Sequence, residues 1–197
     1  ITPDSLLIRL SNIETWGLLF YRGFIPFVVV LFGLILFYKT NFFKALINIG
    51  YTGIFYAISF SVCNVTFIIS IQNTSVANTL IMVAMAPMLS AFLGAFFLKE
   101  TPNKETWFAI IITFLSVTFI FYDSIKLGNI LGDIFGFITA LGLAINANLA
   151  RFAKDRDLVP AAVIGKLGTA AFAFVFVKSF NLINTDIIIV PLMCILC

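Results

Sequence analysis

The chain alternates between long apolar stretches and short polar connections. A helix needs about 20 apolar residues to cross a hydrocarbon core about 30 Å thick, and six stretches are close to this length. They span residues 16–38, 46–71, 76–98, 106–122, 129–150 and 159–180, and an apolar stretch too short to span follows from Ile187. Lipid cannot satisfy backbone hydrogen bonds, and these stretches are too long for barrel strands. The pattern therefore predicts an all-α integral membrane protein, a helical bundle of six complete transmembrane helices and a partial seventh.

The connections between the stretches are short, so consecutive helices are expected to be antiparallel neighbours. The basic residues then fall unevenly on the two sides of the membrane. One side holds Lys39, Lys44, Lys99, Lys104, Arg151, Lys154 and Arg156, and the other holds Arg9, Lys126 and Lys178. By the positive-inside rule the first side is cytoplasmic, which predicts a multi-pass protein of the inner (plasma) membrane.

Composition supports the membrane interpretation. Hydrophobic residues make up 61% of the chain and charged residues 11%, whereas a soluble domain has about 45–50% and about 25%. The chain has no His, and its three cysteines show no CxxC spacing, so no metal site, disulfide framework or cofactor is predicted. No HExxH, GxSxG or complete Walker motif occurs, and we therefore predict no enzyme activity. No nucleic-acid partner is expected.

Two cations lie inside the predicted spans, Arg22 and Lys166. A charge at the centre of a membrane helix costs about 2.5–3.5 kcal/mol on insertion scales, which implies a partner or a water-filled cavity. Either cation is thus a candidate for binding an anionic group or a structural, snorkelling side chain. Pro26 and Pro87 each remove a backbone donor within a span. Such breaks either build transporter sites or simply kink the helix for packing.

Small residues recur every four positions in two spans. One stripe comprises Gly128, Gly132, Gly136, Ala140 and Ala144 and ends at Asn148; the other comprises Asn78, Met82, Ala86, Ser90 and Gly94. Stripes of this kind let helices approach closely. The polar residues of the spans, which include Asn64, Thr66, Asn78, Thr79, Asn146 and Asn148, either line a polar path or bond between helices. Asp133 and Glu100 are predicted to be helix-end charges, with a proton-carrying role as the alternative.

The second part of the chain echoes the first. Arg22 follows Trp16 by six residues and precedes a Phe/Val run, and Lys166 likewise follows Pro160 by six residues and precedes another. If the spans 16–38 and 159–180 are equivalent, the repeat has five helices, and an odd number inverts the second copy in the membrane. This repeat also predicts a helix before Ile1.

The run from Thr74 to Ile81 continues through Ala86-Pro87 to Phe97-Leu98-Lys99-Glu100. This segment resembles the fourth helix of EamA-type transporters of the drug/metabolite transporter superfamily. The segment Phe20-Tyr21-Arg22-Gly23 is similar to the start of their second helix, Trp107 to Asp123 to the fifth, and Leu131 to Arg151 to the sixth. Lys166 departs from the pattern, since that position of the seventh helix is usually apolar or small.

The resemblance implies a ten-helix carrier built from two inverted five-helix repeats around a central cavity. Residues 1–123 would hold helices two to five of the first repeat. Residues 124–197 would hold helices six, seven and part of eight, so the chain is expected to be a fragment lacking the first helix and the last two to three. The implied cavity-lining residues are Asn64, Asn78, Thr79, Met82, Pro87 and Asn146.

The leading hypothesis is a secondary transporter (permease) that carries a small organic metabolite or drug-like compound by alternating access. Arg22 is the first candidate for a functional charge in substrate binding, and Lys166 is a second charge of open role. The alternative is a non-transporting membrane scaffold or accessory subunit of a lipid-modifying complex, which would need no polar residues at the midplane. The expected partners are the lipid bilayer and a small-molecule metabolite, and a homodimer is left open.

Overall fold

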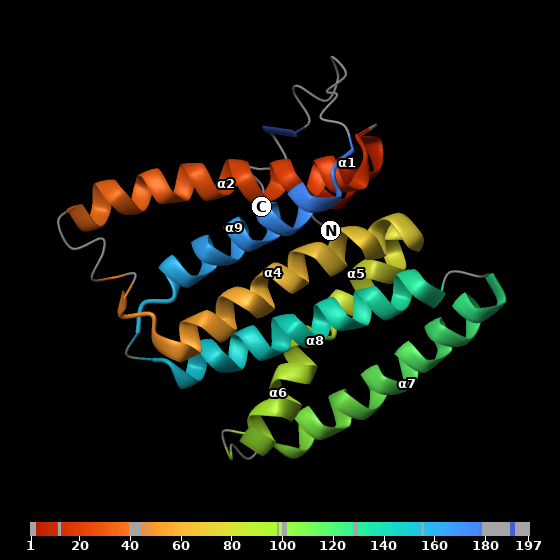
Figure 1. Cartoon of the computed structure of the whole chain (residues 1–197). Helices are drawn as coiled ribbons and strands as arrows, with labels where there is room; N and C mark the ends of the chain where they lie inside the picture. The colour runs from red at the N-terminus through yellow and green to blue at the C-terminus, as the bar shows by residue number, and fades with distance from the viewer. Residues whose placement is uncertain are drawn as a thin grey trace. The chain divides into compact units, whose positions relative to one another are not determined.

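The computed structural model describes residues 3–11, 13–39, 45, 47–97, 99, 102–127, 130–154, 156–178 and 190–191. Within these residues the regular elements are helices, and no strand occurs (Figure 1). Five helical segments are long and apolar enough to cross a membrane: α2 (Thr15–Tyr38), α4 (Gly50–Asn73), the segment Val76–Phe97, α8 (Ile130–Phe152) and α9 (Val159–Phe176). A short helix, α1 (Pro3–Leu10), precedes them. The prediction of a multi-span helical membrane protein is confirmed.

The predicted spans agree closely with these helices, although some ends differ. The span expected to begin at residue 46 begins at Gly50, and the last span ends at Phe176 rather than at residue 180. The predicted span 106–122 lies within α7 (Lys104–Leu127), which begins with two charged residues and is not among the five segments. The expected partial helix from Ile187 lies outside the described residues, apart from Val190 and Pro191.

The third span is broken next to its single proline, Pro87. It consists of α5 (Val76–Ala84) and α6 (Ala86–Phe97), with Met85 between them. Pro87 has no N–H to donate to the carbonyl four residues earlier, which explains why the helix is interrupted at this level. Pro26, by contrast, lies inside the continuous helix α2. The sequence predicted a break or kink at both prolines, and of the two only Pro87 stands at an interruption in the described helices.

The chain divides into two compact units, and the first comprises residues 1–65 and 153–197. Its main packing is between α2 and α9, which run in opposite directions (Figure 1). Trp16 at the start of α2 stacks on Phe176 at the end of α9, with ring centroids 4.8 Å apart. Further along, Gly23 lies against the backbone of Lys166 and Ala170. The close crossing follows from the missing side chain at Gly23.

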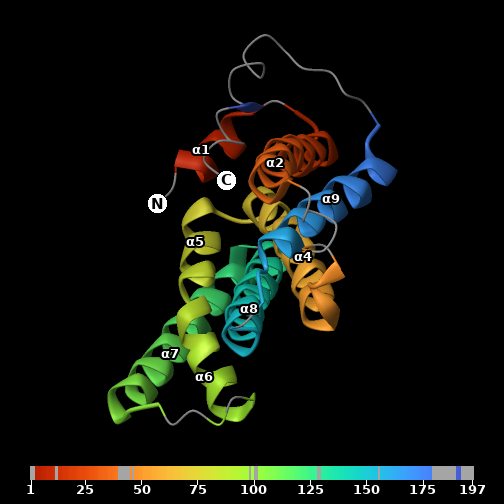
Figure 2. The same cartoon turned by 90° about the vertical axis from the view of Figure 1, so that its left-hand side faces the viewer.

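The second unit, Thr66–Phe152, packs α8 on α5 and α6, and α7 lies beside α6 (Figure 2). From Gly132 on, the two predicted small-residue stripes face each other in this unit, and Gly128 lies outside the described residues. Gly136 lies against Met82, and the Asn148 amide donates to the Ser90 carbonyl at 3.0 Å. Matching positions increase along both helices, so α8 runs parallel to α5 and α6. The stripes are packing faces, as the sequence predicted.

Candidate functional site

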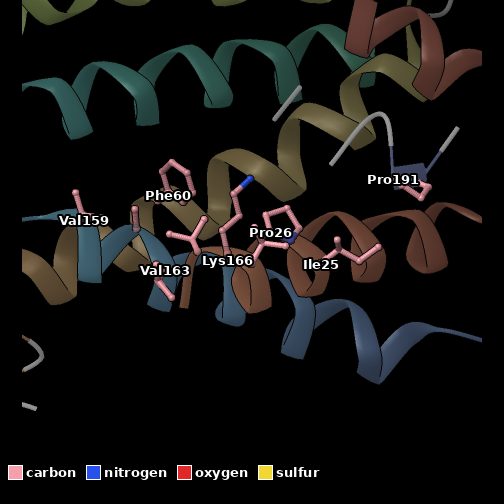
Figure 3. Close-up of a pocket in the computed structure, with 10 residues that line it drawn as sticks. Ile25, Pro26, Phe60, Val159, Val163, Lys166 and Pro191 are labelled. Atoms are coloured by element: carbon pink, nitrogen blue, oxygen red, sulfur yellow. The ribbon is translucent and has the colours of Figure 1, made fainter. Parts of the chain in front are cut away.

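The first unit contains a pocket of about 500 Å³. Helix α2 supplies Ile25 and Pro26 to its wall, Phe60 comes from α4, and Val163 and Lys166 come from α9. Figure 3 shows the Lys166 side chain extending from α9 toward α4, with Phe60 and Pro26 beside it. Lys166 is the one charged side chain among the residues that line this pocket. The pocket therefore combines an apolar wall with a single positive charge.

Lys166 is 9% exposed, which places a cation in the interior of the unit. Its Nζ atom donates to the Asn64 side-chain oxygen at 3.3 Å and lies 5.4 Å from the centre of the Phe60 ring. An amide oxygen and an aromatic face both attract a cation, and a cation–π contact contributes about 0.5–2 kcal/mol depending on solvent exclusion. Both of these contacts are to uncharged groups, and they orient the ammonium group.

Arg22 is also buried, at 7% exposure, on the face of α2 that includes Gly23. The helices α2, α4 and α9 hold these two cations and contain no Asp or Glu in their sequences. Burying a charge is costly unless it is compensated. The spanning helices of the first unit thus carry an excess of positive charge at membrane depth.

The second unit holds most of the other predicted site residues, and several of them bond to one another. Thr79 and Ser70 share a hydroxyl hydrogen bond of 2.8 Å, and Thr66 and Thr139 share one of 2.7 Å. For these threonines the structure supports interhelical bonding rather than an open polar path. Met82 is fully buried against α8, and its role there is packing.

Asp133 lies in the first turn of α8, as predicted, but its carboxyl group is fully buried at 0% exposure. The Asn78 amide donates to Asp133 Oδ1 at 3.5 Å, a long hydrogen bond. The other carboxyl oxygen, Oδ2, has no hydrogen-bond partner among the described residues. The sequence predicts an interfacial side chain here, because Asp133 is near the end of its span. Its burial comes instead from close packing where Gly132 meets Thr74.

Asn146 stands apart from the other polar residues of α8. Its side chain is 5% exposed, and neither amide atom has a hydrogen-bond partner within the described part of the chain. Two residues later, the Asn148 amide donates to Ser90 and to the Ala144 carbonyl. A buried amide without partners costs about 1–3 kcal/mol. Asn148 therefore has a structural explanation and Asn146 has none.

Pro87 lines a separate hollow of about 400 Å³ with Ser90, Ala147 and Arg151. The predicted site residues thus form two local groups. Asn64 and Lys166 meet in the first unit, where Arg22 is also buried, and Asn78, Thr79, Met82, Pro87 and Asn146 belong to the second. The sequence did not single out Phe60 or Ser70, because a Phe among 24 and a Ser within an apolar span carry no distinguishing pattern.

Glu100 lies outside the described residues. Cys63 is a buried thiol.

These features define a multi-span helical membrane protein with polar and charged side chains inside its spans. The EamA-like transporter family matches residues 6–122, and the chain belongs to this family. Family membership makes it a membrane transporter rather than an enzyme, with the lipid bilayer and a small-molecule substrate as its partners. No curated protein and no solved structure matches the chain.

Proposed function

We propose that the chain is part of a secondary transporter that moves a small organic metabolite or drug-like compound across the inner membrane by alternating access. The observation that carries this proposal is the antiparallel crossing of α2 and α9 (Figure 1). Their sequences are the two spans that the repeat predicts to be equivalent. An inverted repeat relates equivalent helices by a two-fold axis in the membrane plane, so helices that meet at the axis run in opposite directions.

The boundary of the family match supports the same repeat. The match ends at residue 122, and the first repeat is proposed to comprise residues 1–123 and the second to begin at residue 124. Under this proposal α2, α4, α5 with α6, and α7 are helices two to five, and α8 and α9 are helices six and seven. Helix α7 would then be a complete span in addition to the five long apolar segments, which gives the six complete spans that the sequence predicts.

Asn146 is proposed to contact the substrate. The buried amide has no hydrogen-bond partner within the described residues, and its cost of about 1–3 kcal/mol is offset if a bound solute supplies the missing bonds. Within the first unit, Arg22, Asn64 and Lys166 are proposed to supply charge and polarity for binding. Within the second unit, Asn78 and Pro87 are proposed to line a substrate path, while the bond of Thr79 to Ser70 and the packing of Met82 account for those two residues. A scaffold protein would need neither a buried cation nor an unpaired amide, so these residues favour a carrier.

The test is solute counterflow with the full chain in proteoliposomes, after a thermal-shift screen of metabolites has selected compounds that bind. Asn146→Leu removes the amide at similar volume. We expect this variant to be as stable as the wild type or more so, because an unpaired buried amide is removed, and to lose at least about tenfold in affinity for the selected compound. Asn73→Leu, at the exposed end of α4, is the control and should retain binding.

The outcomes separate a carrier from a passive membrane protein. Counterflow that requires Asn146 supports the proposal. Folded protein that binds no compound and exchanges none would contradict it. Whether the chain forms a homodimer is a separate question, which chemical cross-linking in the membrane at different protein-to-lipid ratios tests directly.

A further inference from the structure

The pocket around Lys166 differs from an ordinary packing defect in its chemistry. Its wall is apolar side chains from α2, α4 and α9, and its charged member is the Lys166 ammonium group (Figure 3). The volume of about 500 Å³ lies within the range of about 300–1,000 Å³ that holds small organic ligands. The helices that form it contain two cations and no acidic residue.

We infer that this pocket binds an organic acid with one negative charge and an apolar body. The inference rests on the proposed function and names its substrate class. The carboxylate would bind the Lys166 ammonium group, which is a compact positive charge with three hydrogen-bond donors. The apolar body would contact Ile25, Val29 and Phe60 and gain free energy by leaving water.

The same features exclude other solutes. A neutral, polyhydroxylated compound would leave its hydroxyl groups without partners against an apolar wall, which costs about 1–3 kcal/mol for each group. A zwitterionic amino acid would need an acceptor for its ammonium group, and the spanning helices around the pocket contain no Asp or Glu. A compound with several negative charges would find one cation on the pocket wall. A monoanion with an apolar body fits all three conditions.

Binding to the full chain in phosphatidylcholine nanodiscs tests the inference with three matched compounds. They are 3-phenylpropionate, its neutral amide, and phenylalanine, which adds an ammonium group to the same skeleton. We expect 3-phenylpropionate to bind at least about tenfold more tightly than either of the others, since a hydrogen bond to a charged group in an apolar site contributes about that factor or more.

Variants assign the effect to Lys166. Lys166→Met removes the charge while retaining length and apolar character, and it should weaken 3-phenylpropionate binding about tenfold or more without changing binding of the amide. Lys166→Arg keeps the charge and should retain most of the affinity. Lys154→Met, at an exposed position in a turn, is the control and should bind as the wild type does. If Lys166→Met does not fold, the affinities of the wild type and of Lys166→Arg for the three compounds still test whether the pocket prefers the organic acid.

Several results would overturn the inference. Equal affinity for the acid and its amide would do so, as would unchanged binding in Lys166→Met, or no binding of any of the three compounds to folded protein. Loss of 3-phenylpropionate binding when phosphatidylglycerol replaces phosphatidylcholine would show that a lipid headgroup occupies the pocket instead. If any of these results overturns the inference but the same preparation exchanges other compounds by counterflow, the proposed carrier function still holds. If 3-phenylpropionate binds but no compound is exchanged, the carrier function is contradicted and the organic-acid site still holds.

Discussion

Gly23 offers a direct test of how closely α2 and α9 cross. A Cβ atom placed on Gly23 would lie 2.7 Å from the backbone nitrogen of Ala170 and 2.9 Å from the carbonyl oxygen of Lys166. Both atoms belong to the backbone, so they cannot turn away as the end of a flexible side chain can. Gly33 lies on the same helix, and a Cβ there would meet no atom of the described residues within 4 Å. The two glycines are therefore a matched pair.

The expected magnitudes have opposite signs. Replacing Gly by Ala inside a helix stabilises it by about 0.5–1 kcal/mol when there is space, because the unfolded chain loses freedom. Forcing an extra methyl group into a close-packed contact costs about 1–3 kcal/mol. Gly33→Ala should therefore raise the free energy of unfolding by about 0.5–1 kcal/mol, and Gly23→Ala should lower it by about 1–2 kcal/mol.

The free energy of unfolding can be measured by titrating the full chain in mixed micelles with dodecyl sulfate and following tryptophan fluorescence. Trp16 is a suitable reporter, because it stacks on Phe176 across the same pair of helices. Equal shifts for Gly23→Ala and Gly33→Ala would refute the close crossing. A larger loss in Gly23→Leu than in Gly23→Ala, with Gly33→Leu close to the wild type, would support it further.

Two further predictions concern the second unit. Asn148→Ala removes an interhelical hydrogen bond to Ser90 and should lower the free energy of unfolding by about 0.6–1.7 kcal/mol in the same titration; Asn73→Ala, which loses a bond within its own helix, should change it by less than about 0.5 kcal/mol. Pro87→Ala restores an N–H that can donate to Val83, so α5 and α6 should join and amide exchange near Met85 should slow. Unchanged exchange there would show that the break does not depend on proline, and slower counterflow in the joined helix would link the break to transport.

The helices themselves were predictable because the membrane leaves few alternatives. A long apolar stretch must become a helix when no water is present to satisfy its backbone, and this reasoning located α2, α8 and α9 to within a few residues. The small-residue stripes could be assigned to packing faces for a similar reason, since Gly136 and Ala140 recur at a spacing that places them on one side of a helix. Periodicity therefore predicts which face packs.

The partners across each interface were not predictable from the sequence. Lys166 and Asn64 are 102 residues apart, and Asn78 and Asp133 are 55 residues apart. No spacing rule links residues on different helices. The burial of Asp133 likewise depends on how near Gly132 comes to Thr74, which is a property of the packed unit and not of α8 alone. The sequence identified unusual residues, and the folded chain determined which of them meet.

Gly23 and Lys166 show how packing and candidate chemistry depend on each other in this chain. The carbonyl oxygen of Lys166 is one of the atoms that a Cβ at Gly23 would strike, so α2 comes close to α9 at the residue that carries the buried cation. One turn further along α2, Pro26 lines the pocket into which that cation projects. Moving the α9 backbone away from Gly23 would therefore displace the Lys166 ammonium group from Asn64 and Phe60. A substitution at Gly23 should then weaken both folding and organic-acid binding.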